Sequence, residues 1–347
     1  MKKYIILAMA LCLAAACGRT VTPTKHDADK LSFDAWVTVQ MQKHPKPEYL
    51  WQQTRLGSWI LEDTPGTGDL IDTSQDSLYV RLNYTSRSTN GTINSTTYAR
   101  IAQQLGTYNE TYYYGPDIIY VPGSFAGLED ILEGMRDGGR RKAAVPGWLH
   151  TYSRYDSPEK YLNDSTSRAA VIYDIEVVEH FRNTDKWELD SIARYLVRQF
   201  PSRYGKDAGK ARADSAGAHG FYYIQTEAPS GDKALTDTTV YINYTGRRLD
   251  GSVFDTTVRD TAIFYGLYSK SKTYGPVSVK YGTKWSDIKL DSNSVIEGFA
   301  RTLSCMKENE KGTGIFYSPI GYAYKGSGSA IPAYSPLRFD IELVQKQ

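Results

Sequence analysis

The chain contains an internal repeat, in which similar segments return after about 160 residues. Apolar residues at helical spacing predict an amphipathic helix over 33–41, ended by Pro45, and a second over 189–197, ended by Pro201. A repeat of this length divides the 347 residues into two domains of ordinary size rather than one large domain.

Strand patterns support the same repeat. After each predicted helix the chain has short stretches rich in aromatic, β-branched and other apolar residues, as expected for strands. These stretches form three matching pairs: 57–61 with 220–224, 79–85 with 239–245, and 172–178 with 338–344. Each copy is therefore predicted to be a helix followed by a β-rich domain.

The second copy contains a strong hairpin signal. Alternation over 240–245 predicts a strand, and Asp250-Gly251 supplies the residues that a tight turn requires. Tyr244 on one arm and Phe254-Asp255 on the other can then face the same concave surface.

This stretch resembles the opening of an FKBP-type peptidyl-prolyl isomerase domain. Four later blocks resemble the family in its own order: Val295–Phe299, Tyr322–Tyr324, Ile331–Pro332 and Leu337–Leu343. The resemblance implies an α+β fold with two FKBP-like domains. Each would be a twisted antiparallel sheet wrapped on one short helix, preceded by an amphipathic helix.

The resemblance also implies a site in the second copy. Tyr324 would donate its hydroxyl to a substrate carbonyl, and Asp255, tied to Tyr244, would lie near the twisting carbonyl. Phe299 would form the floor. The remaining implied substrate-binding residues are Phe254, Val295, Ile296, Ile331 and Phe339. The alternative for the apolar members is that they only pack the core.

Two neighbours of this site carry further expectations. Arg259 stands near the place where the family often has an Arg that pairs with its Asp. Lys325 replaces the glycine that follows the second Tyr of the family motif. The segment 264–293 is longer than usual, and it is either a flap that contacts substrate or a solvated surface excursion.

The first copy departs further from the family. It keeps Tyr84 but places Asn94 where the acidic residue would stand, and it has no clear Tyr-Ala-Tyr or Ile-Pro. A buried helix face persists at Leu128, Ile131, Leu132 and Met135. We expect a domain that preserves the fold with weakened or absent isomerase activity, or alternatively a divergent binding cleft.

Composition excludes several classes of function. The formal net charge is +2 with 23% charged residues, so no basic excess indicates nucleic-acid binding. No Cys/His spacing predicts a metal site and no glycine motif predicts a nucleotide, so no cofactor is expected. Cys305 is interpreted as a small buried hydrophobe rather than a reactive thiol.

The amino terminus has the pattern of a bacterial lipoprotein signal peptide. Two lysines and an apolar run over 4–13 precede Ala14-Ala15-Ala16-Cys17. We expect a signal peptide over 1–16, lipidation of Cys17 and a polar tether over 17–30. The alternative is an ordinary secretory signal cleaved near Ala16.

The predicted domains follow from these assignments. Residues 31–181 form the degenerate FKBP-like domain with its helix, 182–219 a helical linker that is loose from 202 onward, and 220–347 the isomerase domain. The resemblance implies a peptidyl-prolyl isomerase that acts on proline-containing clients. The lipoprotein pattern adds a lipid anchor and hence exported clients. Because Gly18-Arg19 after Cys17 lacks an acidic residue, we expect the outer membrane, facing the periplasm, if the organism has one. The alternative function is a non-catalytic peptide-binding or assembly lipoprotein.

Overall fold

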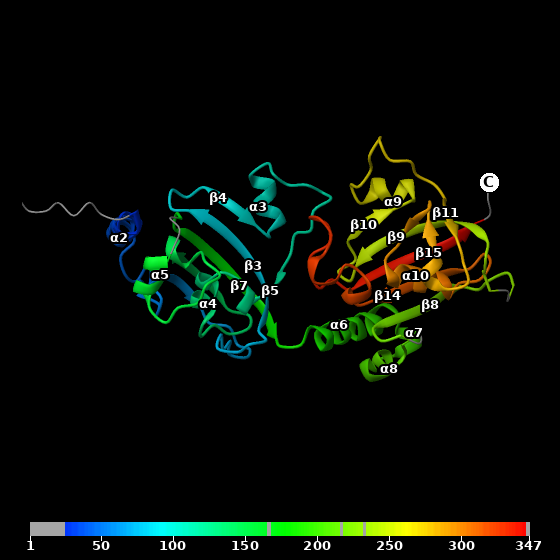
Figure 1. The fold of residues 1–347 in the computed structure, drawn as a ribbon, viewed down its shortest axis with the longest axis horizontal. Coiled ribbons are helices and arrows are strands. Elements are labelled where there is room, and N and C mark those ends of the chain that lie inside the picture. The colour runs from blue at the N-terminus through cyan, green and yellow to red at the C-terminus, as the bar shows by residue number, and fades with distance from the viewer. Residues whose placement is uncertain (1–24, 165–167, 216–217, 232–233, 345–347) are drawn as a thin grey trace, which may run out of the picture.

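The computed structural model describes residues 25–164, 168–215, 218–231 and 234–344. Each half of the chain forms its own antiparallel sheet, and helix α6 (Thr184–Gln199) connects the two halves (Figure 1). The predicted signal peptide and Cys17 lie outside the described residues. Among the residues that are described, no helix has the length and apolar character needed to cross a membrane.

The first half is a seven-stranded sheet in the order β1-β2-β6-β7-β3-β4, with β5 also paired to β3. Its elements are α2 (Lys25–Lys43), β1 (Gln52–Gln53), β2 (Trp59–Thr64), β3 (Tyr79–Ser88), β4 (Ile93–Thr96), α3 (Ala99–Gln104), β5 (Asp117–Tyr120), η1 (Val121–Gly123), α4 (Ala126–Leu132), β6 (Arg140–Val145), η2 (Gly147–Leu149), α5 (Pro158–Asp164) and β7 (Val171–Phe181). Helix α2 begins at Lys25, so the tether predicted over 17–30 overlaps the first turns of this helix.

The second half is an eight-stranded sheet in the order β13-β12-β11-β9-β15-β14-β8, with β10 paired to β9. Its elements are α7 (Pro201–Tyr204), α8 (Ala208–Ala213), β8 (Phe221–Glu227), β9 (Thr239–Arg248), β10 (Val253–Thr256), α9 (Arg259–Phe264), β11 (Val277–Lys280), η3 (Trp285–Asp287), β12 (Lys289–Leu290), β13 (Asn293–Ser294), α10 (Glu297–Ser304), β14 (Lys311–Phe316), η4 (Ser318–Ile320), η5 (Ala323–Lys325) and β15 (Leu337–Val344). The two halves share one topology, in which β3, β4 and β7 correspond to β9, β10 and β15.

The predicted fold class is confirmed by this α+β arrangement of antiparallel sheets. The turn between β9 and β10 depends on Gly251, whose φ of +92° lies in a region that residues with a side chain rarely adopt. The hairpin places Asp255 opposite Gly246. This register brings the functional side chains of the two strands to one face.

One short helix fills the concave face of each sheet. In the first half, α4 buries Leu128, Ile131 and Leu132 against β3, β6 and β7, and α2 adds Phe33 and Val37 to the same core. In the second half, α10 buries Phe299 and Leu303 against β14 and β15. The apolar face predicted for α2 is therefore buried, as the sequence pattern indicates.

The segment predicted as a linker packs on the second sheet. Ile192 and Leu196 of α6 bury against Tyr222 of β8 and Ile315 of β14, on the face opposite α10. The segment from 202 onward was predicted to be loose, but it contains most of α7 and all of α8, and Ala211 of α8 is fully buried in this cluster. Helices α6 to α8 thus cover the outer face of the second sheet.

The long segment 264–293 belongs partly to the common fold. Its strand β11 pairs with β9 just as β5 pairs with β3 in the first half. The part without a counterpart is the small hairpin of β12 and β13, which extends the sheet beyond β11. The second half therefore differs from the first by this added hairpin.

Candidate functional site

The concave face of the second sheet holds a cavity of about 470 Å³, called here the C-terminal cavity. Strands β9, β10 and β15, helix α10 and the segment 322–331 supply its walls. It is lined by Tyr244, Phe254, Asp255, Leu290, Ser294, Val295, Ile296, Phe299, Tyr322, Ser327, Ala330, Ile331 and Phe339. Eight of the nine site residues that the sequence predicts are in this list.

Aromatic rings form the floor of the C-terminal cavity. Phe299 is 3% exposed. The centroid of its ring lies 5.5 Å from that of Tyr244 and 5.0 Å from that of Phe339, and both pairs are edge-to-face. Phe254 packs on Phe339 at 5.6 Å. This approach requires a glycine at 246, because a Cβ there would lie 2.6 Å from the Phe254 ring. Such edge-to-face contacts fix the rings relative to one another.

Two polar side chains meet at the rim. The hydroxyl of Tyr244 donates to Asp255 Oδ2 at 2.7 Å, as the resemblance implies. Burial, together with the Asp255 charge, raises the pKa of Tyr244, so the hydroxyl keeps its proton at neutral pH. Lys272 Nζ donates to the other oxygen, Asp255 Oδ1. Both carboxylate oxygens of Asp255 are therefore occupied.

The structure corrects the predicted partner of Asp255. Arg259 does not pair with it; the Arg259 guanidinium lies over the Tyr268 ring at 5.3 Å. The pairing cation is Lys272, which belongs to the long segment 264–293. This segment also contributes Leu290 to the cavity wall. Part of this segment therefore lies beside the cavity.

The structure also corrects the predicted hydroxyl donor. Tyr324 is 62% exposed and does not line the cavity; its ring lies beneath Lys325 Nζ at 5.6 Å. Tyr322 lines the cavity instead, and burial followed by the charge of Asp255 raises its pKa. The chain reverses between them at Ala323, where φ is +52°. The motif identified the tyrosine pair but not which of the two faces inward.

The first half has a smaller cavity in the same place, called here the N-terminal cavity. Its volume is about 250 Å³, and it is lined by Leu82, Tyr84, Ser86, Ser95, Asp117, Ile119, Phe125, Leu128, Tyr173 and Ile175. Tyr84 corresponds to Tyr244, and Leu128 takes the place of Phe299. Ser86 pairs with Ser95 as Gly246 pairs with Asp255.

This register corrects one prediction for the first copy. Ser95, not Asn94, stands where the second half has Asp255, and its hydroxyl lies 3.2 Å from the Tyr84 hydroxyl. Asn94 stands in the place of Phe254, one residue earlier. The hairpin of the first half thus keeps a polar contact but has no acidic group at that position.

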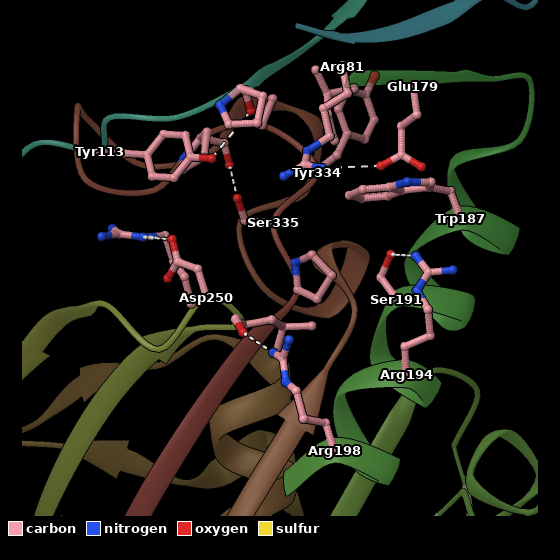
Figure 2. Close-up of a pocket in the computed structure, with 17 residues that line it drawn as sticks. Arg81, Tyr113, Glu179, Trp187, Ser191, Arg194, Arg198, Asp250, Tyr334 and Ser335 are labelled. Atoms are coloured by element: carbon pink, nitrogen blue, oxygen red, sulfur yellow. Dashed lines mark hydrogen bonds and ion pairs between the residues drawn. The ribbon is translucent and has the colours of Figure 1, made fainter. Parts of the chain in front are cut away.

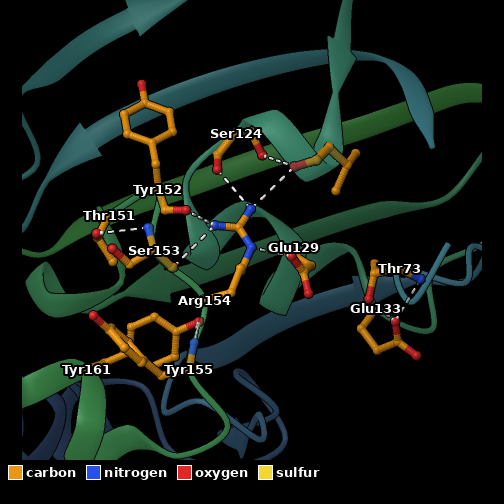
Figure 3. Close-up of polar contacts among 11 residues, drawn as sticks. Thr73, Ser124, Glu129, Glu133, Thr151, Tyr152, Ser153, Arg154, Tyr155 and Tyr161 are labelled. Atoms are coloured by element: carbon orange, nitrogen blue, oxygen red, sulfur yellow. Dashed lines mark hydrogen bonds and ion pairs between the residues drawn. The ribbon is translucent and has the colours of Figure 1, made fainter. Parts of the chain in front are cut away.

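Arg154 anchors the loop that follows η2 in the first half. Arg154 donates to Glu129 Oε2 at 2.7 Å, to the Ser124 carbonyl at 2.8 Å and to the Tyr152 carbonyl at 3.1 Å (Figure 3). These bonds tie the loop after η2 to the start of α4. This loop replaces the segment that carries Tyr322 in the second half.

A third cavity, of about 280 Å³, lies between the two halves (Figure 2). Residues 332–336 line it, while residues 327–331 of the same loop reach the C-terminal cavity. The backbone N–H of Tyr113 in the first half donates to the Ser329 carbonyl at 2.7 Å. Arg248 lies over the Tyr113 ring at 5.2 Å and donates to the Ala330 carbonyl. The first half therefore contacts the loop that forms one wall of the C-terminal cavity.

The C-terminal and N-terminal cavities are lined by aromatic, aliphatic and neutral polar groups together with one carboxylate each, Asp255 and Asp117. Within the described part of the chain, no group of three or more His, Cys, Asp and Glu side chains is arranged to hold a metal ion. Cys305 is half-buried beside the second core, and burial raises the pKa of its thiol. A thiol with a raised pKa is a poor nucleophile, in agreement with its interpretation as a small hydrophobe.

Comparisons with known proteins agree with the site. Residues 231–344 match the sequence model of the FKBP-type peptidyl-prolyl cis-trans isomerase family. The chain is 30% identical over 126 residues to the macrophage infectivity potentiator of Trypanosoma cruzi, covering 36% of this chain and 52% of that protein. It is 23% identical over 159 residues to a probable FKBP-type peptidyl-prolyl cis-trans isomerase of Haemophilus influenzae, covering 46% of this chain and 56% of that protein. The chain thus spans about half the length of these relatives.

Solved structures of similar proteins include FkpA from Escherichia coli. It has 23% sequence identity and a TM-score of 0.30, with 47% of this chain and 62% of that chain covered. The structure of the three FKBP domains of wheat FKBP73 has 17% identity and a TM-score of 0.28, with 83% of this chain and 93% of that chain covered. Residues 231–344, which build the C-terminal cavity, are thus similar in sequence to the FKBP-type peptidyl-prolyl cis-trans isomerase family.

Proposed function

We propose that the second half of the chain catalyses cis-trans isomerisation of X-Pro bonds in polypeptides, with the C-terminal cavity as its active site. One observation carries this proposal: a cavity of about 470 Å³ combines an aromatic floor with the Tyr244–Asp255 pair at its rim. The similarity of residues 231–344 to the FKBP-type peptidyl-prolyl cis-trans isomerase family supports the same activity.

The reaction asks for a particular kind of cavity. Amide resonance creates a barrier of about 18–20 kcal/mol to rotation about the X-Pro bond. At the top of that barrier the imide is twisted and less polar than the planar form, so it loses less on leaving water. An apolar cavity therefore stabilises the twisted form more than the planar form, which is the requirement for catalysis. No nucleophile or proton transfer is needed.

Each group of the cavity has a role in this proposal. Phe299 and Phe339 provide the water-poor surface on which the proline ring packs. The Tyr322 hydroxyl faces the cavity and donates to a substrate carbonyl. Asp255, held by Tyr244 and Lys272, presents a fixed dipole beside the twisting carbonyl.

A second candidate function is a non-catalytic peptide clamp. The Lys272–Asp255 ion pair favours it, because the ammonium group neutralises the one carboxylate of the C-terminal cavity. A clamp would hold the planar and twisted forms of the X-Pro bond equally well, so it would bind the peptide without accelerating its isomerisation.

We further propose that the protein acts on exported polypeptides while anchored to a membrane by acyl chains on Cys17, on the outer membrane facing the periplasm. The small residues before Cys17 at the end of the apolar run support the acyl anchor, and the lack of an acidic residue at Gly18-Arg19 supports the outer membrane. Uncatalysed X-Pro isomerisation takes tens to hundreds of seconds, so exported chains profit from a catalyst. Replacing Cys17 by Ser tests the anchor: the protein should leave the detergent phase and lose acyl label.

A protease-coupled assay with proline tetrapeptides separates isomerase from clamp. The proposal expects the full chain to shorten the slow phase of cleavage in proportion to enzyme concentration. If the chain binds the same peptides in a calorimeter while the slow phase keeps its uncatalysed rate, the clamp function replaces the enzyme function.

A further inference from the structure

We propose that the N-terminal cavity binds one cationic side chain, Lys or Arg, of a polypeptide. This site lies outside residues 231–344, and the proposal does not depend on isomerase activity in the second half. Its basis is a carboxylate that faces an aromatic cavity and that no cation among the described residues pairs with.

Three aromatic rings surround the N-terminal cavity. Tyr84 reaches it from β3, Phe125 from the start of α4 and Tyr173 from β7. Phe125 and Tyr173 stack with 5.5 Å between ring centroids and 29° between planes. The face of an aromatic ring carries negative charge density, so a cluster of such rings attracts a cation. The rings alone would equally well accept an apolar group.

Asp117 distinguishes the two possibilities. It is the first residue of β5, pairs with Leu82 across the sheet and lines the N-terminal cavity together with Ile119. Ile118 between them points to the other side of the sheet, where it lines the cavity between the halves. The Asp117 carboxylate is therefore directed at the rings.

No cation of the described part of the chain pairs with the Asp117 carboxylate, and its side chain makes no hydrogen bond there. The neighbouring cation on β3, Arg81, faces the opposite side of the sheet and pairs with Glu179 at 3.2 Å. Burial is the sole cause that raises the pKa of Asp117. A half-buried carboxylate without a partner costs free energy that a bound cation would recover.

The second half shows that this charge is specific to the first. Val277 occupies the position of Asp117, because it pairs with Ile242 as Asp117 pairs with Leu82. In the C-terminal cavity the acid is Asp255 on β10, and Lys272 neutralises it. In the N-terminal cavity the acidic residue is Asp117 on β5, and Ser95 occupies the position that corresponds to Asp255. Among the described residues, the carboxylate of the N-terminal cavity is therefore unpaired, whereas the carboxylate of the C-terminal cavity is paired with Lys272.

The size of the N-terminal cavity limits its occupant. Its 250 Å³ is below the roughly 300–1,000 Å³ of sites that enclose a whole small ligand. One extended side chain with a cationic end fits this description: its methylene groups would pack on Leu128 and Ile175, and its charge would reach Asp117. A carboxylate side chain would be repelled.

Calorimetric titration of the full chain with capped pentapeptides tests the site. The peptides have Lys, norleucine or Glu as the central residue among Ala and Gly, and they contain no proline. The protein variants are Asp117→Asn, which is nearly isosteric, and Asp76→Asn, which removes an exposed carboxylate of the same half. Thermal melts by circular dichroism establish that both variants are folded.

We expect the Lys peptide to bind at least roughly tenfold more tightly than the norleucine peptide, with the Glu peptide weakest. Asp117→Asn should abolish this preference and Asp76→Asn should keep it. Equal binding of the Lys and norleucine peptides to the unmodified chain would overturn the proposal. So would a preference for Lys that survives Asp117→Asn.

Discussion

The Tyr244 hydroxyl donates to Asp255 Oδ2 at 2.7 Å, across the hairpin of β9 and β10. The corresponding pair in the first half is Tyr84 and Ser95, whose oxygens lie 3.2 Å apart. The two hairpins thus share their geometry and differ in charge. This difference separates the cavity proposed to catalyse from the cavity proposed to bind a cation.

The two partners of the Asp255–Lys272 ion pair should contribute unequally to activity. Asp255→Asn removes the charge that polarises the twisting carbonyl, at a cost of about 1–3 kcal/mol or roughly 5- to 150-fold in kcat/KM. Lys272→Met removes only a partner whose side chain is 40% exposed and screened by water. We expect kcat/KM to change by less than about fivefold in that variant. Equal losses in both variants would show that the ion pair, not the carboxylate, is what matters.

Tyr322 and Tyr324 form a matched pair of tests. Tyr322→Phe deletes a hydroxyl that faces the C-terminal cavity, and we expect kcat/KM to fall by roughly 5- to 150-fold. Tyr324→Phe deletes a hydroxyl on an exposed ring outside the cavity and should leave kcat/KM nearly unchanged. Steady-state assays of the two variants decide the assignment. The opposite order of effects would return the donor role to Tyr324.

Glu188 should make stability depend on pH. It is buried on α6, its carboxylate accepts from the Ser318 N–H at 2.5 Å and the Ser318 hydroxyl at 2.7 Å, and burial raises its pKa from 4.5 to about 7. Between pH 4.5 and 7 the folded chain keeps a proton that the unfolded chain releases, so the free energy of unfolding falls as pH rises. The fall is on the order of 3 kcal/mol.

Urea unfolding at pH 5, 6 and 7 measures this slope. Glu188→Gln keeps a neutral amide next to Ser318 and should flatten the slope over this range. Glu308→Gln removes an exposed carboxylate of the same half and should leave the slope unchanged. A slope that persists in Glu188→Gln would assign the proton to another group.

Helices α6 to α8 should be required for the stability of the second half. A fragment of residues 184–347 keeps them, whereas a fragment of residues 220–347 exposes Tyr222, Ile224 and Ile315, which are at most 5% exposed in the chain. At roughly 1.5–3 kcal/mol per buried side chain, the shorter fragment loses several kcal/mol. Thermal melts of both fragments give the comparison. Equal midpoints would mean that the helices are an independent linker.

The sequence predicted those features that depend on local pattern. The Asp250-Gly251 turn and the alternation along β9 each follow from neighbouring residues. The floor at Phe299 was implied by the resemblance of Val295–Phe299 to the family. Features that depend on the path of a loop were not. Whether Tyr322 or Tyr324 faces inward is decided by the backbone at Ala323, which no spacing reveals.

Long-range partners were equally inaccessible. Lys272 reaches Asp255 only because β11 returns the chain to β9, and an Arg near the hairpin seemed the better candidate. The helices after 201 are rich in Lys, Gly and Ala, which is typical of a loose connection. They are ordered because Ala211 and Tyr204 pack on the second sheet, a tertiary contact that overrides local preference.

The most direct test of the proposed function is the value of kcat/KM for a proline peptide, measured on the two halves separately. A folded fragment of residues 184–347 should retain most of the kcat/KM of the whole chain, and a folded fragment of residues 25–181 should have almost none. Two results would contradict the assignment of the active site to the C-terminal cavity. One is activity found only in the 25–181 fragment, and the other is a folded 184–347 fragment that leaves the peptide at its uncatalysed rate.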